Sequence, residues 1–539
     1  MKKLEDHTAL IVEPHSGMPG SLRNMLNLGG ITEIDNAVSS STAIRALRKK
    51  SYDLILCEYA LGEGQDGQQL LEDLRHNKII PLWTAFIMVT GERSYEKVVS
   101  AAELSPTDYI LKPFAAEILL ERVARAVNKQ TVLSPIYELM ENGNLRQAIK
   151  VCEDEEARYR RYAVDFMRLR AELHVALGEP TQAETIYELL AATKAVGWAR
   201  LGLAKTLFMQ ERFGEAEELL TALVTEKDKF MDAYDWLAKT HEAKGQLSEA
   251  QSVLAQAVAI SPHAVRRLRK LGEVALQAGD MNTAERSFQQ VVAKAKYSEF
   301  RDPEDHVRLV KTLVTKGDAE QAASVVRDLE KSLKGQKKMP ACRAISAALV
   351  HAHTGDTARA AEELDAAVAA CRESVGLSDD MKMELAKNCL QHNLDAGASE
   401  IMLEVMSNAS NSTALAKAAS VFEQAGRTEL AGQLVEKSRE QVNDLVLSGV
   451  EKAKQGDYQG AVDLMGAAVK KLPENPQVVF NAAVAFLKYL ENIGWDLALS
   501  EQLRAHIETA RRLDPTNPKL VSLNNHYQEI LKKFGIDKS

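Results

Sequence analysis

Strand-length apolar runs alternate with amphipathic segments over roughly the first 130 residues. The apolar runs are Thr8–Val12, Leu54–Cys57, Phe86–Val89 and Tyr109–Leu111. Because almost no polar residue interrupts them, each strand is expected to be buried on both faces. Helical periodicity marks the segments Ser21–Leu28, Thr42–Lys50, Gly67–His76, Tyr95–Ala102 and Ala115–Lys129. This alternation predicts an α/β, doubly wound parallel sheet whose ligand site lies at the carboxyl ends of the strands.

From about residue 131 the pattern becomes purely helical and repeats. A glycine followed five residues later by an alanine recurs at Gly143, Gly178, Gly245, Gly279, Gly317, Gly355, Gly426 and Gly456, and Glu211 takes the same place without a glycine. Glycine permits a tight turn between paired helices, and alanine lets the helices approach closely. The spacing of about 34 residues is typical of tetratricopeptide (TPR) repeats. We therefore predict an all-α TPR superhelical solenoid.

The predicted domains are a sheet domain at 1–130, the solenoid at 131–515 and a C-terminal capping helix at 516–539. The solenoid should hold about ten helix pairs, each burying its apolar face against its neighbours. Its frame is degenerate near 372–412, where Gly397 is out of register and Asn408–Thr413 predicts a loop with Thr413 as a helix cap.

Composition excludes several classes of protein. The 539 residues are 45% hydrophobic, 27% charged and 5% aromatic, which excludes disordered and collagen-like chains. A net charge of −9 gives no global attraction to nucleic acid. Five scattered cysteines indicate neither a disulfide framework nor a zinc cluster. No apolar stretch is long enough to span a membrane, so we expect a cytoplasmic protein that binds neither membrane nor nucleic acid.

Chemistry-bearing residues follow the predicted strands. The segments that stand out are Asp53–Glu58, Asp66–Gly67, Val89–Gly91 and Asp108–Phe114. Together, in this order, they resemble a response-regulator receiver domain over about residues 5–129. The resemblance implies a flavodoxin-like, CheY-like fold.

The resemblance also assigns roles to single positions. Glu58 stands where the family has its phosphoacceptor aspartate, so it is a pseudo-phosphoacceptor. Glu13 matches the first member of the acidic pair that holds Mg²⁺, whereas Pro14 replaces the second. Thr90 and Lys112 match the residues that bind phosphoryl oxygens. The aromatic residue that rotates when the family's switch operates corresponds to Tyr109.

The two replacements change the expected chemistry. Proline has no carboxylate, so a metal site built from Glu13 and Glu58 alone should hold Mg²⁺ only weakly. We therefore expect no resident cofactor. Glu58 reaches further than aspartate and could partly mimic a phosphoryl group, with less charge and fewer oxygens. Alternatively, it forms a salt bridge with Lys112 that fixes the domain in one state.

Partner binding is expected along the solenoid groove, where Asn481 could bond a peptide backbone, although a plain surface polar residue is the favoured interpretation of Asn481. The basic runs Arg158–Tyr162 and Arg266–Lys270 could bind an acidic partner or RNA, but a solvated helix face is favoured because acidic residues flank them.

The sequence contains no P-loop, GxSxG or HExxH motif and no paired Cys/His spacing, so it predicts no enzyme. The favoured function is a bacterial two-component-type adaptor: a phosphorylation-independent receiver that regulates a partner protein bound by its TPR repeats. The alternatives are a phosphorylatable response regulator that switches partner binding, or a structural component of a pilus, secretion or motility assembly. The sequence names neither the partner nor the oligomeric state.

Overall fold

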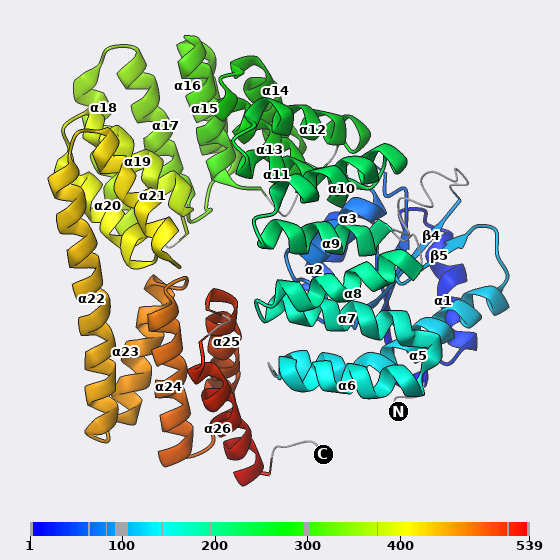
Figure 1. The fold of residues 1–539 in the computed structure, drawn as a ribbon. Coiled ribbons are helices and arrows are strands. Elements are labelled where there is room, and N and C mark those ends of the chain that lie inside the picture. The colour runs from blue at the N-terminus through cyan, green and yellow to red at the C-terminus, as the bar shows by residue number, and fades with distance from the viewer. Residues whose placement is uncertain are drawn as a thin grey trace. The chain divides into compact units, whose positions relative to one another are not determined.

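The computed structural model describes residues 4–62, 65–81, 83–91, 106–141, 144–193, 197–262, 264–295, 301–373, 376–514 and 517–535. The chain forms two compact units. The first holds residues 1–175 and 179–301, and the second holds residues 302–539 together with 176–178. The sheet domain and the first repeats therefore belong to one unit (Figure 1).

The first unit begins with a five-stranded parallel sheet in the order β2-β1-β3-β4-β5. Its strands are β1 (Thr8–Val12), β2 (Glu33–Ala37), β3 (Leu54–Glu58), β4 (Ala85–Thr90) and β5 (Asp108–Leu111). The order reverses beside β1, which places the carboxyl ends of β1 and β3 at the switch point where doubly wound sheets bind ligands. β2 has no apolar run because it is an edge strand whose residues are mostly exposed.

Helices cover both faces of this sheet. Leucines of α1 (Met18–Leu28) and of α5 (Ala116–Glu141) pack on one face. Apolar residues of α2 (Ser40–Leu47) and α3 (Gly67–His76) pack on the other. Asp66 caps α3 by accepting a hydrogen bond from Gln69 N at 2.8 Å. The predicted helix Tyr95–Ala102 lies outside the described residues.

The helix α5 continues through residue 130, where the sequence placed a domain boundary, and ends at Glu141. It therefore belongs to the sheet domain at its start and packs against the first solenoid helix, α6, towards its end. The remaining helices of this unit are α6 (Leu145–Arg158), α7 (Ala163–Ala176), α8 (Pro180–Thr193), α9 (Gly197–Met209), α10 (Phe213–Glu226), α11 (Met231–Ala243), α12 (Leu247–Ile260), α13 (Val265–Ala278) and α14 (Met281–Ala295). Short 3₁₀ turns occur at Leu4–Asp6 and Arg160–Tyr162.

The second unit is entirely helical in its described residues. Its helices are α15 (Pro303–Lys316), α16 (Ala319–Ser332), α17 (Met339–His353), α18 (Thr357–Glu373), α19 (Asp379–Gln391), α20 (Asp395–Ser407), α21 (Ser412–Gln424), α22 (Thr428–Lys454), α23 (Tyr458–Lys471), α24 (Pro476–Asn492), α25 (Leu497–Leu513) and α26 (Lys519–Lys533). Successive helices pack as antiparallel neighbours along the chain, so the predicted all-α solenoid is confirmed.

The turns between paired helices explain the repeat pattern. The repeat glycines with a described backbone have positive φ, for example 76° at Gly245. Glu211 adopts the same left-handed conformation, with φ 61°. In the degenerate stretch Asn393 does so, with φ 56°, and the buried Ala398 follows five residues later. Asparagine tolerates this conformation better than most residues do, so the repeat frame passes through Asn393 and not through Gly397.

One local expectation needs correction. Asn411 caps α21, because its side chain accepts a hydrogen bond from Ala414 N at 2.9 Å, whereas Thr413 lies within the helix. In addition, α22 runs unbroken for 27 residues. The first half of α22 is the second helix of one repeat, and its second half is the first helix of the next repeat. In this second half Gly449 lies directly against Met465 of α23.

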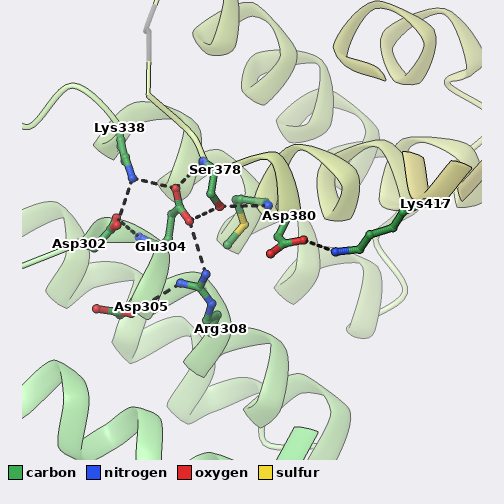
Figure 2. Close-up of polar contacts among 9 residues, drawn as sticks. Asp302, Glu304, Asp305, Arg308, Lys338, Ser378, Asp380 and Lys417 are labelled. Atoms are coloured by element: carbon green, nitrogen blue, oxygen red, sulfur yellow. Dashed lines mark hydrogen bonds and ion pairs between the residues drawn. The ribbon is translucent and has the colours of Figure 1, made fainter. Parts of the chain in front are cut away.

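An ion cluster joins the starts of several helices in the second unit (Figure 2). Lys338 Nζ lies 3.0 Å from Asp302 and 2.9 Å from Glu304, which is 1% exposed. Glu304 also accepts hydrogen bonds from Ser378 N at 2.8 Å and Ser378 Oγ at 2.6 Å. The cluster therefore ties α15 to the segments that precede α17 and α19.

Candidate functional site

The carboxyl ends of the strands hold a lysine between two carboxylates. Lys112, which follows β5, places its Nζ 2.6 Å from Glu13 Oε2 and 2.6 Å from Glu58 Oε2. The Glu13 side chain is 1% exposed, that of Glu58 7% and that of Lys112 15%. The structure thus brings together three residues that lie far apart in the sequence.

Local backbone geometry aims both carboxylates at the lysine. Glu58 Oε1 accepts hydrogen bonds from the amides of Tyr59 at 2.7 Å and Ala60 at 3.2 Å. Glu13 Oε1 accepts one from His15 N at 3.1 Å and lies 2.8 Å from His15 Nδ1. Each carboxylate therefore uses one oxygen to bond its own loop and the other to bond the Lys112 ammonium.

The charges in this pocket stabilise one another. Burial alone would raise the pKa of Glu13, but hydrogen bonds from Lys112 and His15 outweigh it, so this pKa is lowered. Burial likewise opposes the charge of Lys112, but its bonds to Glu13 and Glu58 prevail and its pKa is raised. Glu13 and Lys112 are therefore both charged at neutral pH.

Thr90 and Tyr109 lie on the neighbouring strands. Thr90, at the end of β4, is 1% exposed, and its carbonyl accepts a hydrogen bond from Lys112 N at 2.7 Å. Tyr109 is half-buried on β5 and packs against the cluster between the sheet and helices α2 and α3. Both residues thus lie on the two strands that precede Lys112 at this edge of the sheet.

The residues present do not fit a Mg²⁺ ion. Glu13 and Glu58 each direct one oxygen to Lys112, and Pro14 supplies no carboxylate. Within the described residues, no group of three or more His, Cys, Asp or Glu side chains is placed to hold a metal. An ammonium thus lies between the carboxylates, where a divalent cation would need several oxygen ligands.

The sheet domain matches a known protein family. The profile of the response regulator receiver domain matches residues 9–124. Chemotaxis protein CheY-3 of Vibrio cholerae is 30% identical over 117 residues, which cover 21% of this chain and 86% of that protein. The chain belongs to the response regulator receiver family. Chemotaxis protein CheY of Pseudomonas aeruginosa is 29% identical over 119 residues, or 22% of this chain and 92% of that protein.

The solenoid has its own match. A tetratricopeptide repeat profile matches residues 237–299. A tetratricopeptide repeat protein from Parabacteroides merdae aligns with 51% of this chain and 98% of its own, at 15% identity and a TM-score of 0.35. Part of a TPR protein from Cytophaga hutchinsonii covers 44% of this chain and 94% of its own, at 16% identity and a TM-score of 0.36. A receiver domain followed by TPR repeats indicates two-component-type signalling through protein–protein contacts.

Asn481 lies in the wall of a groove of about 420 Å³ formed by α22, α23 and α24. Its Nδ2 donates a hydrogen bond to Gln477 O in its own helix at 2.8 Å. Apolar side chains such as Val450 and Val484 form the groove together with Lys454. None of the described helices is both long and apolar enough to cross a membrane.

Sequence reasoning missed a contact between the receiver domain and the solenoid. The basic run Arg266–Lys270 was expected to be a solvated helix face, yet Arg267 is 1% exposed and lies 3.0 Å from Glu72 on α3. Gln69 and Gln68, also on α3, are 5% and 8% exposed. Two glutamines and a glutamate on the polar side of this amphipathic helix predict a solvated face. Their burial is visible only once the solenoid packs against them.

Proposed function

We propose that this chain is a signalling adaptor whose receiver domain works without phosphorylation and whose repeats bind a partner protein. The ammonium of Lys112, held 2.6 Å from both Glu13 and Glu58, carries the proposal. This arrangement pairs the pocket charges permanently.

Charge requirements support this view. Phosphoryl transfer is catalysed mainly by positioning and by cations that neutralise the transferred group. Here Pro14 removes one ligand of such a cation, and Lys112 already binds the two carboxylates that remain. A glutamate at the acceptor position also carries about one negative charge, against nearly two for a phosphoryl group.

The direct test is incubation with acetyl phosphate and Mg²⁺, followed by intact mass spectrometry. We expect no adduct on the wild-type chain and none on Glu58→Asp, because that variant still has Pro14. The double variant Pro14→Asp/Glu58→Asp restores both replaced carboxylates and should gain phosphate. A stoichiometric, acid-labile adduct on wild type would favour a phosphorylatable response regulator instead.

We place partner binding in the groove of α22–α24. Its apolar wall, with Val450 and Val484, suits an apolar side chain of a bound peptide. Lys454 adds positive charge at the same groove, Lys488 is paired there with Glu491 at 2.7 Å, and Asn481 offers an amide. The partner segment should therefore be an extended or helical peptide that carries both apolar and acidic side chains.

Affinity purification of the full chain tests this placement. Val450→Arg puts a bulky charge into the groove and should release proteins that co-purify with the wild-type chain. The matched control is Val521→Arg, because Val521 on α26 is 62% exposed. If both variants retain the same proteins, the partner does not use this groove.

A further inference from the structure

The receiver domain rests on the solenoid through the polar face of one amphipathic helix. In α3 the leucines Leu70, Leu71 and Leu74 belong to the receiver core. The opposite face carries Gln69, whose Nε2 donates a hydrogen bond to Ser261 Oγ at 3.2 Å, and Glu72, whose side chain is 12% exposed. A polar helix face is normally left to water, so its burial here marks a docking surface.

The solenoid side of this surface is built around one arginine. Arg267 Nε lies 2.9 Å from Asp235 Oδ1, and its Nη2 lies 3.0 Å from Glu72 Oε2. Arg266 Nη2 donates to Asp235 Oδ2 at 2.7 Å. Two guanidinium groups thus share the carboxylate of Asp235, and Glu72 supplies the second negative charge.

The docking contact is incompletely satisfied. Arg267 Nη1 and Glu72 Oε1 are both buried and have no hydrogen-bond partner among the described residues. Buried polar atoms without partners cost free energy. Burial also raises the pKa of Glu72 to about 7, a rise that Asp232 and Asp235 increase and Arg267 and Arg266 oppose. Burial thus disfavours the charged carboxylate of Glu72, whereas burial of Arg267 is outweighed by Asp235 and Glu72, which together raise the pKa of Arg267. The arginine is therefore held mainly by Asp235 of the solenoid, and the glutamate on α3 is the weaker member of the contact.

The same helix begins at the pocket. Gly67, its first residue, donates a hydrogen bond from its amide to Tyr59 O at 2.7 Å. A methyl group on Gly67 would come within 2.4 Å of Glu58 O, so the backbone of α3 lies directly against the acceptor position. A rearrangement at Glu58 would therefore act on the start of the docked helix.

We propose that the face formed by α11 and α13 is a binding site for an acidic helix, that α3 occupies it in the resting chain, and that a partner helix with a glutamate opposite Arg267 displaces α3. The partner is recognised by the chemistry of α3: an amide side chain one turn before a carboxylate, on the face opposite its leucines. The proposal goes beyond the adaptor function and does not depend on it, since the contact with α3 can fail whether or not Glu58 is phosphorylated.

A labelled peptide with the sequence of residues 65–78 is the probe. In the full chain carrying Glu72→Lys, the intrinsic α3 is repelled by Arg267 and the site becomes free. We expect this chain to bind the peptide at least about tenfold more tightly than wild type does, a factor that corresponds to the loss of one competing contact. A peptide with Glu72→Lys should not bind either chain.

Two further variants keep the test decisive. Glu72→Gln preserves the side-chain shape and should give intermediate binding. Glu121→Lys reverses an exposed carboxylate on α5, 68% exposed in its pair with Arg125, and should behave as wild type. Hydrogen exchange over α13 should rise in Glu72→Lys and stay unchanged in Glu121→Lys. Equal or absent peptide binding in wild type and Glu72→Lys, or unchanged exchange over α13, overturns the proposal.

Discussion

The receiver domain meets a cation in two places, and the two contacts differ in how completely the carboxylates are satisfied. In the pocket, Glu13 bonds both Lys112 and His15, and its pKa is lowered. At the solenoid, Glu72 pairs with Arg267, one of its buried oxygens has no hydrogen-bond partner in the described part of the chain, and its pKa is raised to about 7. Similar ion pairs thus accompany opposite shifts in the pKa of the carboxyl group. Hydrogen bonds outweigh desolvation for Glu13 in the pocket, whereas desolvation prevails for Glu72 at the docking face.

This difference suggests a division of roles within one domain. The pocket is a fixed element whose charges keep its three strand ends in place. The docking face is the element that can change, because releasing Glu72 into water returns its hydration. A signal that the chain receives as a protein contact can therefore act on the docking face without any chemistry in the pocket.

The largest effect is expected from removing the pocket cation. Lys112→Met leaves the buried carboxylates of Glu13 and Glu58 without a counter-ion, which should cost about 3–5 kcal/mol of receiver stability. Urea unfolding followed by hydrogen exchange of the sheet would measure it. Arg125→Met, which removes an exposed pair with Glu121, should cost less than about 0.5 kcal/mol. A similarly small loss for Lys112→Met would contradict the idea of a charge-locked pocket.

A more exposed lysine between two carboxylates provides the next comparison. Lys338→Met removes the cation that joins Asp302 and Glu304 in the second unit. We expect a loss of about 2 kcal/mol, smaller than for Lys112, because Lys338 is 27% exposed and Glu304 keeps its bonds from Ser378. Thermal unfolding of the second unit would report it.

The control for that variant lies in the same part of the chain. Lys417→Met breaks the ion pair between Lys417 and Asp380 (Figure 2). The two side chains are 65% and 72% exposed, respectively. The free energy of unfolding of the second unit should change by no more than about 0.5 kcal/mol. If both variants cost equally little, burial is not what gives the Glu304 cluster its strength.

The smallest effect is a pH dependence of opposite sign at the two sites. The lowered pKa of Glu13 means that its contribution is present above its unfolded-state pKa and is lost as the pH falls through the lower folded value. The raised pKa of Glu72 means that its carboxylate takes up a proton more readily when α3 is docked than when α3 is free. Docking should therefore strengthen as the pH falls from above 7 towards the unperturbed value, by up to about 1.4 kcal/mol per pH unit.

Hydrogen exchange over α13 at pH 8 and pH 6, corrected for the intrinsic rate, would measure this dependence. Glu72 faces Asp232 and Asp235 on α11 and Arg266 and Arg267 on α13, so Glu72→Gln is the control that removes its titration. Protection that falls between pH 8 and pH 6, or that changes equally in Glu72→Gln, would contradict the assignment to Glu72.

Much of the fold could be predicted because its signals are local or periodic. The fully buried strands appear as apolar runs, whereas β2, exposed at the sheet edge, has no such run. The repeat frame was visible wherever glycine occupies the left-handed turn. It was lost at Asn393, which reaches the same conformation with a different side chain.

The residues that form the pocket could be predicted, but the bonds among them could not. Resemblance to receiver domains indicated Glu13, Glu58 and Lys112, and one interpretation paired Glu58 with Lys112. Nothing in the sequence indicated that the same ammonium also binds Glu13. That bond depends on the positions of β1 and β5, which are not neighbours in the sheet.

The sequence by itself determined the two kinds of architecture and the replacement of the acidic pair, since alternation, a period near 34 residues and the identity of Pro14 are properties of the chain alone. Only the tertiary structure decided that Arg267 is buried against Glu72 and not solvated. Residues 72 and 267 belong to different domains, and each segment is compatible with an exposed helix face. Their burial arises solely from packing one domain against the other, which leaves no periodic trace in either segment.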